Sequence, residues 1–186
     1  LDAAGDRLYV LSGSTLMVFA ASVGSVLGVL ELLGAGLDLA VSAAGAVARL
    51  LYMGIEAFLL ASSLIMTQAQ RLYRKLCTAC KKKRALPLEI FRLNHIDPAM
   101  FEGVEMFGAG GCPKCMNTGY KGRGALMEIL LVDEKVKQIM LKDASAGAIR
   151  DQAIQNGMQT LRDVGLERVK TGLTSIEEIL MVTSGE

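Results

Sequence analysis

The chain has 186 residues, of which 52% are hydrophobic, and its formal net charge of +1 is too small for composition alone to indicate a polyanionic partner. The length suffices for one moderate domain or two small ones. Residues 1–48 carry four acids and one base, and nearly all the basic residues follow them. Two regions of different character are therefore expected.

The segment from Leu8 to Leu30 contains no charged residue and is long enough to cross a membrane as one helix. Gly24 and Gly28 have the small-xxx-small spacing that suits helix packing in a bilayer. A buried core segment is one alternative, and a stretch from a truncated or frame-shifted coding region is another. The sequence leaves the three open, so residues 1–42 stay an unassigned apolar segment.

Two helices are predicted after this segment. Residues 46–53 form the first, and Gly54 ends it, because glycine adopts a left-handed backbone without steric cost. Residues 56–76 form the second, which is apolar in its first half. Its last turns are basic and would complement the negative end of the helix dipole.

The C-terminal part is predicted to hold one strand and several short helices. The strand covers residues 125–132, and an amphipathic helix follows over 133–141. The cap and stop signals of the later helices come from serine, threonine and glycine. They are Ser145 with Gly157, Thr160 with Gly172, and a capping box from Thr174 to Glu177.

Four cysteines form two Cys-x-x-Cys pairs, and no other cysteine is present. No basic stretch precedes the first apolar run, so a secretory signal is not indicated and disulfides are not expected. Two such pairs complete a tetrahedron of sulfurs around one metal ion, with no place left for a catalytic water. The site is therefore predicted to be structural, with zinc held by Cys77, Cys80, Cys112 and Cys115.

An iron–sulfur cluster also uses four cysteines, and a redox dithiol uses one pair, so both are weaker alternatives. His95 is the only histidine, and we interpret it as a surface or loop residue rather than a substitute ligand. Thirty-one residues separate the two pairs. A compact zinc ribbon prefers less, so a sub-structure must lie between them.

Seven basic residues without an acid among them surround the first cysteine pair. They favour either an anionic partner, such as nucleic acid or acidic lipid, or a solvated ring around a negative tetrathiolate. We favour the ring, because only Tyr73 could stack on a base. The residues are Arg71, Arg74, Lys75, Lys81, Lys82, Lys83 and Arg84.

The chain contains no phosphate-binding loop of the form Gly-x-x-x-x-Gly-Lys-[Ser/Thr]. Residues 121–124 are rich in glycine but lack the lysine and hydroxyl pair that grips phosphate and magnesium. With a single histidine and no nucleophile near a base, no catalytic or cofactor-binding residue can be assigned. The chain does not have the motifs of a complete enzyme.

Several stretches together resemble the secretion ATPases, which are the motors of type II secretion and type IV pilus assembly. The longest are AGAVARLLYMGIEAFLLASSL over 44–64 and GCPKCMNTGYKGR over 111–123. The shorter stretches are 69–72, 74–77, 128–129, 149–150, 157–163, 165–166 and 174–183. The resemblance covers about residues 43–183.

This resemblance implies an α+β, mostly helical C-terminal fragment of a hexameric, RecA-like α/β ATPase. It divides the chain into the end of the ATPase core (43–76), a tetracysteine zinc subdomain (77–132) and a C-terminal helical bundle (133–186). The whole family is expected to need ATP and magnesium. It drives pilin or pseudopilin assembly at the cytoplasmic face of the bacterial inner membrane, against platform proteins there.

This chain departs from the family pattern in its first part. The family's phosphate loop, acidic Walker B segment and histidine box should precede residue 43, yet residues 37–42 read LDLAVS. Ala57 stands where proline is common. We therefore transfer the four zinc ligands and the assembly context, but no ATP-contacting residue, and expect no hydrolysis by this chain alone. A zinc-ribbon nucleic-acid binder and a membrane-anchored zinc protein are the alternative functions.

Overall fold

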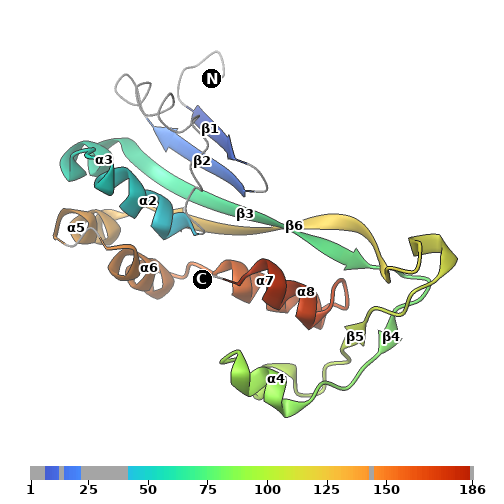
Figure 1. Cartoon of the computed structure of the whole chain (residues 1–186). Coiled ribbons are helices and arrows are strands. Elements are labelled where there is room, and N and C mark those ends of the chain that lie inside the picture. The colour runs from blue at the N-terminus through green and yellow to red at the C-terminus, as the bar shows by residue number, and fades with distance from the viewer. Residues whose placement is uncertain (1–6, 13–14, 22–41, 143–144, 185–186) are drawn as a thin grey trace. The chain divides into compact units, whose positions relative to one another are not determined.

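The computed structural model describes residues 7–12, 15–21, 42–142 and 145–184 (Figure 1). The chain divides into two compact units, each built from segments distant in sequence. The first unit holds residues 1–71 and 127–161, and the second holds 72–126 and 162–184, with the last two residues assigned to the first. The α+β class is confirmed, because seven α-helices accompany two antiparallel sheets in the described residues.

A four-stranded sheet has the order β1-β2-β3-β6. Its strands are β1 (Arg7–Ser12), β2 (Thr15–Ala21), β3 (Leu64–Leu76) and β6 (Tyr120–Leu131). β1 pairs antiparallel with β2, and β2 with β3. The amide of Val132 donates to Ile65 and that of Cys77 to Gly119, so β6 also runs antiparallel to β3.

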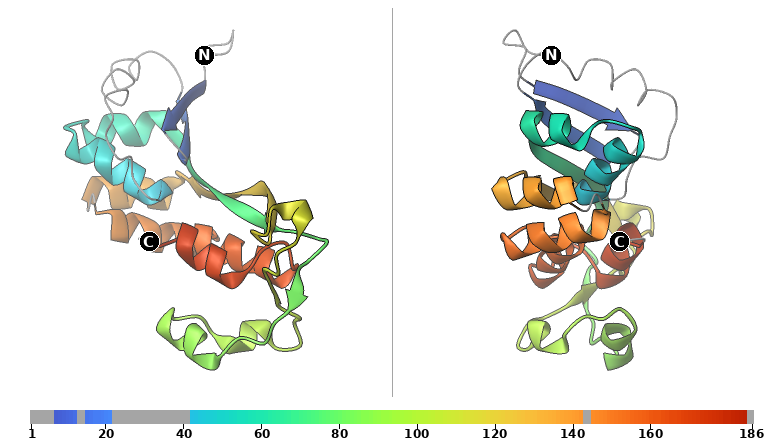
Figure 2. Two further views of the ribbon diagram at one scale, coloured as in Figure 1. Left: turned by 45° about the vertical axis from the view of Figure 1, so that its right-hand side comes forward. Right: turned by 90° about the vertical axis from the view of Figure 1, so that its left-hand side faces the viewer.

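Four helices belong to the first unit, and each touches another of the set, as the element contacts and Figures 1 and 2 agree. α2 and α5 both contact α6, and α3 contacts α5. They are α2 (Ala43–Tyr52), α3 (Ala57–Ser63), α5 (Glu134–Lys142) and α6 (Ala146–Gln155).

Side chains of β6 alternate between buried and exposed, as the two-residue period of a strand requires. Leu126, Glu128 and Leu130 are buried, whereas Met127 and the other odd-numbered residues that follow are exposed. One member of the buried row is a carboxylic acid, which needs polar partners in such a place.

Glu128 finds these partners at the first residues of two helices. One carboxylate oxygen accepts from the amide of Ala43, which begins α2, at 2.7 Å. The other accepts from the amide of Leu161, which begins α7 (Leu161–Lys170), at 3.3 Å. The first amides of a helix lack partners within it and lie at its positive end, so a carboxylate is favoured there. Glu128 thereby joins segments far apart in sequence.

The predicted start of the first helix is three residues late. Ser42 accepts a hydrogen bond from the amide of Gly45 at 3.1 Å, and α2 begins at Ala43. Residues 43–45 are alanines and a glycine, which show no hydrophobic periodicity, so the sequence does not predict them as part of the helix. The predicted stop is confirmed, because Gly54 has a φ of 90°.

The long helix predicted over residues 56–76 is wrong. Only Ala57–Ser63 is helical, and β3 follows directly from Leu64. β3 pairs with β2 over Leu64–Gln68 and with β6 on its other side, and Thr67 and Ala69 are fully buried on one face. Sheet context has overridden a stretch whose leucines, glutamines and arginines favour helix.

The predicted strand over residues 125–132 is confirmed, but β6 begins earlier, at Tyr120. Its first part contains Gly122 and Gly124, which resemble a loop in sequence. Gly124 is required by packing, because a Cβ built there would lie 2.5 Å from the ring of Tyr73. Glycine within a strand here marks the close approach of a neighbouring side chain.

The tail forms helices close to those predicted. Asp133 caps α5 by accepting from Val136 at 2.9 Å, and Ser145 caps α6 by accepting from Ala148 at 3.3 Å. Gly157 and Gly172 have positive φ after α6 and α7, as predicted.

The predicted capping box is wrong by one residue. α8 (Ile176–Val182) is capped by Ser175, which accepts from the amide of Glu178 at 3.4 Å. Thr174 instead donates its hydroxyl hydrogen to the carbonyl of Arg74 at 2.8 Å. The threonine therefore connects β3 to the tail of its own unit.

The described part of the apolar segment Leu8–Leu30 forms β1 and β2 and not a helix, and residues 22–30 lie outside the described residues. Among the described helices, none combines the length and the apolar character needed to cross a bilayer. Residues 37–42, where the family's histidine box was sought, lie outside the described residues except for Ser42.

Replacing Glu128 by alanine should lower the free energy of unfolding by at least about 2 kcal/mol, since hydrogen bonds to a charged group are worth about 1.5–3 kcal/mol each. Glu128→Gln should lose about half as much, because the side-chain oxygen of glutamine can accept one hydrogen bond but its NH2 group cannot accept the other. Urea denaturation gives both values. Exposed Glu134→Ala is the control, and an equal loss there would contradict the assigned role.

Gly124→Ala should lower the free energy of unfolding by about 1–3 kcal/mol, the usual cost of overpacking. Gly147→Ala is the matched control, because a Cβ at Gly147 meets nothing within 4 Å and the position is helical. There alanine should stabilise by about 0.5–1 kcal/mol. Thermal denaturation of the two variants tests the difference, and a neutral Gly124→Ala would be inconsistent with the packing against Tyr73.

Candidate metal centre

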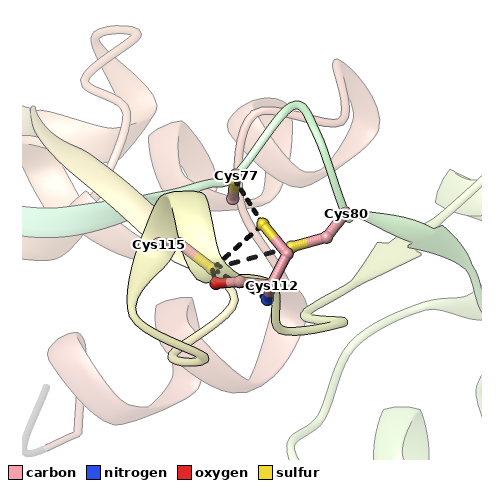
Figure 3. Close-up of side chains that lie close together, drawn as sticks. All are labelled: Cys77, Cys80, Cys112 and Cys115. Atoms are coloured by element: carbon pink, nitrogen blue, oxygen red, sulfur yellow. Dashed lines mark hydrogen bonds between the residues drawn. The ribbon is translucent and has the colours of Figure 1, made fainter.

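The structure brings the four predicted cysteines together at the end of the β3–β6 pair (Figure 3). Cys77 follows the last residue of β3, and Cys80 closes a turn in which its amide donates to the carbonyl of Cys77 at 3.2 Å. Cys112 precedes the short 3-10 turn Pro113–Cys115, and Cys115 ends it, shortly before β6. Both pairs thus lie on turns that a strand holds in place.

The sulfur atoms lie within 4.8 Å of one another. The Sγ atoms of Cys77 and Cys112 are 3.9 Å apart, those of Cys80 and Cys115 are 3.8 Å apart, and those of Cys112 and Cys115 are 3.7 Å apart. These separations are far longer than a disulfide bond of about 2.05 Å. Four sulfurs about 2.3 Å from a central zinc ion would be about 3.8 Å apart in a regular tetrahedron. The donor set therefore fits zinc.

Backbone amides point at the sulfurs. Gly111 donates to the Sγ of Cys80 at 3.3 Å, and Cys112 and Gly119 donate to the Sγ of Cys115 at 3.3 and 3.2 Å. Donors of this kind stabilise the negative charge of thiolates, and they keep the ligands in position. The site is prepared for anionic sulfur.

Glycine allows the turns to approach each other. A Cβ on Gly110 would lie 2.0 Å from the carbonyl oxygen of Cys80, and Gly111 has a φ of 96°. Met116 and Asn117 also have positive φ, which bends the chain back toward Gly119. The two turns pack so closely that side chains are excluded between them.

The thiols differ in acidity without a metal. Burial raises the pKa of the Cys80 thiol to about 11, against the opposing effect of the Gly111 amide. Burial also disfavours ionisation of Cys115, but the amides of Cys112 and Gly119, with the neighbouring sulfurs, outweigh it and lower its pKa to about 6. Metal binding must remove the proton from the Cys80 thiol, so it competes with acid.

The sub-structure expected between the cysteine pairs is an arm that runs from residue 81 to residue 111 (Figures 1 and 2). β4 (Lys82–Lys83) pairs antiparallel with β5 (Phe107–Gly108). Beyond that pair lie α4 (Leu88–Leu93) and the 3-10 turn Pro98–Phe101. The rings of Phe91 and Phe101 meet at 5.5 Å between centroids and form a small core.

Several basic residues of the run around the first pair hold the arm to the tail helices of the same unit. Lys81 donates to the carbonyl of Gly172 at 3.0 Å and lies over the ring of Phe107 at 4.4 Å. Arg84 contacts the carboxylate of Glu177 at 2.9 Å. Lys83 pairs with Glu105 within the arm. These residues serve internal contacts that spacing alone did not reveal.

Arg74 and Glu178 form a contact that the sequence did not predict. The carboxylate of Glu178 accepts from the backbone amide of Arg74 at 2.8 Å and from its Nε at 2.9 Å, and this raises the pKa of the arginine. The guanidinium also lies 4.4 Å from the ring centroid of Tyr120. Glu178 is buried, so the pair fixes α8 against the strands of its unit.

His95 follows α4 in the arm and is exposed, with a φ of 54°. It is not a member of the cysteine cluster. Its interpretation as a loop residue agrees with this position.

Comparison with known proteins places most of this chain in one family. The family of type II/IV secretion system proteins matches residues 39–181. The chain is 41% identical over 142 residues to the type II secretion system ATPase E of Vibrio cholerae, which covers 76% of this chain and 28% of that protein. It is 38% identical over 141 residues to the type IV pilus assembly ATPase PilB of Thermus thermophilus, covering 76% of this chain and 16% of that protein.

A further relative is the type IV pilus assembly ATPase PilB of Pseudomonas aeruginosa, with 37% identity over 142 residues, 76% of this chain and 25% of that protein. The chain thus spans less than a third of the length of these curated relatives. The matched region begins at residue 39 and contains both cysteine pairs, the described helices from α2 to α7 and most of α8. The chain belongs to the type II/IV secretion system protein family.

Proposed function

We propose that this chain acts as the C-terminal segment of a hexameric motor ATPase that powers type II secretion or type IV pilus assembly. Relatives 37–41% identical over three quarters of the chain bear the names of such ATPases, and that similarity carries the proposal. The parent ATPase would have a RecA-like α/β core, of which residues 43–76 form the end. It would work at the cytoplasmic face of the bacterial inner membrane, against platform proteins there.

Within this segment, we assign zinc to Cys77, Cys80, Cys112 and Cys115, as a structural ion. When bound, zinc supplies four strong bonds and no catalytic position. The cysteines position the start and the end of the arm, and the amides of Gly111 and Gly119 balance the negative charge of the sulfurs. Residues 77–132 would form a zinc subdomain, and residues 133–186 a helical bundle that supports packing of the hexamer.

The segment itself is proposed to bind no nucleotide. Neither a phosphate loop nor a histidine box occurs in its sequence, and the glycine-containing stretch 121–124 forms part of β6. ATP and magnesium would belong to the whole motor. The proposed role of this segment is therefore structural, because it holds the arm of residues 81–111 against α7 and α8.

The observations do not favour the alternative functions. Lys81, Lys83 and Arg84, on which a nucleic-acid site would depend, have partners inside the chain. A membrane anchor over Leu8–Leu30 finds no support, because the described part of that segment forms strands.

The purified chain should contain about one zinc ion per molecule, the stoichiometry of a four-thiolate site. Cys112→Ser should lose this ion, and hydrogen exchange should then accelerate in residues 77–119 more than in α5 and α6. Elemental analysis and exchange mass spectrometry give the two readouts. Because structural zinc is worth about 10–16 kcal/mol in small modules, the loss should be plain.

His95→Ser is the matched control for metal content and should retain the zinc. Retention of full zinc by Cys112→Ser would refute the ligand assignment. If the purified protein contained iron and showed a visible charge-transfer absorption, the site would hold an iron–sulfur cluster and not zinc.

The purified chain should hydrolyse no ATP above the background of a protein-free blank in the presence of magnesium. The type II secretion system ATPase E of Vibrio cholerae, assayed in parallel, is the positive control. Turnover that copurifies with the chain and depends on magnesium would contradict a segment without an ATP site.

A further inference from the structure

Within the described residues, β6 is the edge strand of its sheet, since the strand order is β1-β2-β3-β6 (Figure 1). The amide of Val132, the residue after β6, donates to Ile65 on β3. Because the amides of a strand alternate in direction, those of Met127, Ile129 and Leu131 point away from β3. No described residue outside the sheet bonds to the backbone of these three residues. A free edge of this kind is a template for pairing with another extended chain.

The side chains of the same three residues form an exposed apolar row. The exposed fraction is 44% for Met127 and Ile129 and 64% for Leu131. The row lies on the face of β6 opposite to buried Glu128 and Leu130, because side chains alternate along a strand. In strand addition, main-chain hydrogen bonds supply the affinity and pockets for alternate side chains supply the specificity. The free edge and the apolar row provide the first of these requirements.

A cavity of about 300 Å³ beside the end of β6 provides the second requirement. This volume is at the lower end of the usual range for ligand pockets, about 300–1,000 Å³, so the cavity suits one long side chain. All the residues that line it belong to the first unit. They are Ile129 and Leu131 on the strand, Asp133 after it, and Ala153, Asn156, Gly157 and Met158 at the end of α6.

Among the described residues that line the cavity, Asp133 alone is charged. Its carboxylate accepts from the amide of Val136 at 2.9 Å and from the side-chain amide of Asn156 at 2.8 Å, which are both neutral donors. No described cation forms an ion pair with it. α6 ends at Gln155, so the negative end of its dipole borders the cavity. Both charges have the same sign, and the cavity therefore favours a cation.

We propose that the edge of β6 binds an extended segment of a partner protein by strand addition, and that an arginine of this segment enters the cavity. The guanidinium donates to Asp133, and the aliphatic part of the side chain packs on Leu131 and Met158. Apolar side chains two and four positions away pack on Ile129 and Met127. Arginine suits the cavity better than lysine, because its planar group offers five donors and is more weakly hydrated. This binding activity goes beyond the proposed motor function and does not depend on it.

A synthetic peptide with this pattern tests the site on the whole chain as purified. The probe is acetyl-TVTITRT-amide, in which valine, isoleucine and arginine share one face of the strand. Hydrogen exchange followed by ¹⁵N NMR should show the amides of Met127, Ile129 and Leu131 protected at least about tenfold, because each gains a partner. The amides of Glu128 and Leu130 point toward β3, so the peptide should change their exchange little.

Citrulline in place of the peptide's arginine is the matched control for charge, because it has nearly the same shape and is neutral. The citrulline peptide should bind roughly tenfold more weakly, since charge-assisted hydrogen bonds are the stronger ones. Asp133→Asn keeps an oxygen that can cap α5, and it should bind the two peptides with nearly equal affinity. Asp151→Asn removes an exposed charge on α6 outside the cavity and should keep the preference for arginine.

N-methylation of the peptide distinguishes strand addition from binding of the arginine alone. Only every second amide of an added strand faces β6. Methyl groups on one alternate set of peptide amides should therefore abolish binding, and methyl groups on the other set should leave it. Acetyl-arginine-amide, which has no strand to add, should bind far more weakly and leave the exchange of the β6 amides unchanged.

Protection of the three amides, with a preference for arginine that only Asp133→Asn removes, supports the proposal. Equal binding of the arginine and citrulline peptides to the wild-type chain overturns the role of the cavity. Binding that tolerates both sets of N-methyl groups overturns strand addition. The absence of binding at millimolar peptide, by a chain that retains its zinc and a well-dispersed NMR spectrum, overturns both. Zinc content and ATP hydrolysis test the proposed function separately, and neither result depends on this site.

Discussion

The pairing of β3 with β6 brings the two halves of the cysteine cluster to the same place. At one end Val132 donates to Ile65, and at the other Cys77 donates to Gly119 at 2.9 Å. The second of these bonds places the first cysteine pair beside the turn that holds the second pair. The metal centre therefore needs no separate framework, because β3 ends at Leu76 beside the point where β6 begins at Tyr120.

Charged side chains then attach helices to this strand pair. Glu128 on β6 accepts from the first amides of α2 and α7, and Glu178 on α8 accepts from the backbone and the side chain of Arg74 on β3. In each case a buried carboxylate satisfies donors that would otherwise be unpaired. In the arm, two cationic side chains make the corresponding contacts. Lys81 donates to the carbonyl of Gly172, and Arg84 donates to the carboxylate of Glu177. Polar contacts between distant segments thus define how the tail helices of each unit are held.

The sequence predicted the parts of the molecule that depend on local chemistry. The positive-φ glycines at 54, 157 and 172 and the cap at Ser145 follow from residues within one turn of each other. The four cysteines were found together because two matched pairs have few other uses. The metal itself stays a prediction, and so do the segment boundaries.

The features that were missed depend on partners far away in the chain. Residues 64–76 contain good helix formers, and only the neighbouring strands make them extended. Gly124 resembles a loop residue until the ring of Tyr73 is placed against it. The Glu177 capping box failed because Thr174 bonds to Arg74 across 100 positions. No local pattern carries that information.

The two ends of the arm are held together at its base, and this affects how its length can vary among related proteins. The four sulfurs and the β4–β5 pair fix both ends of the insertion, so its middle can change in length without disturbing the sheet. Chain-closure entropy grows only slowly, by about 0.6 kcal/mol for each doubling of a flexible loop. The segment from Ala85 to Met106 could therefore be exchanged for another recognition element, in evolution or by design, while the cysteine cluster and the sheet are kept.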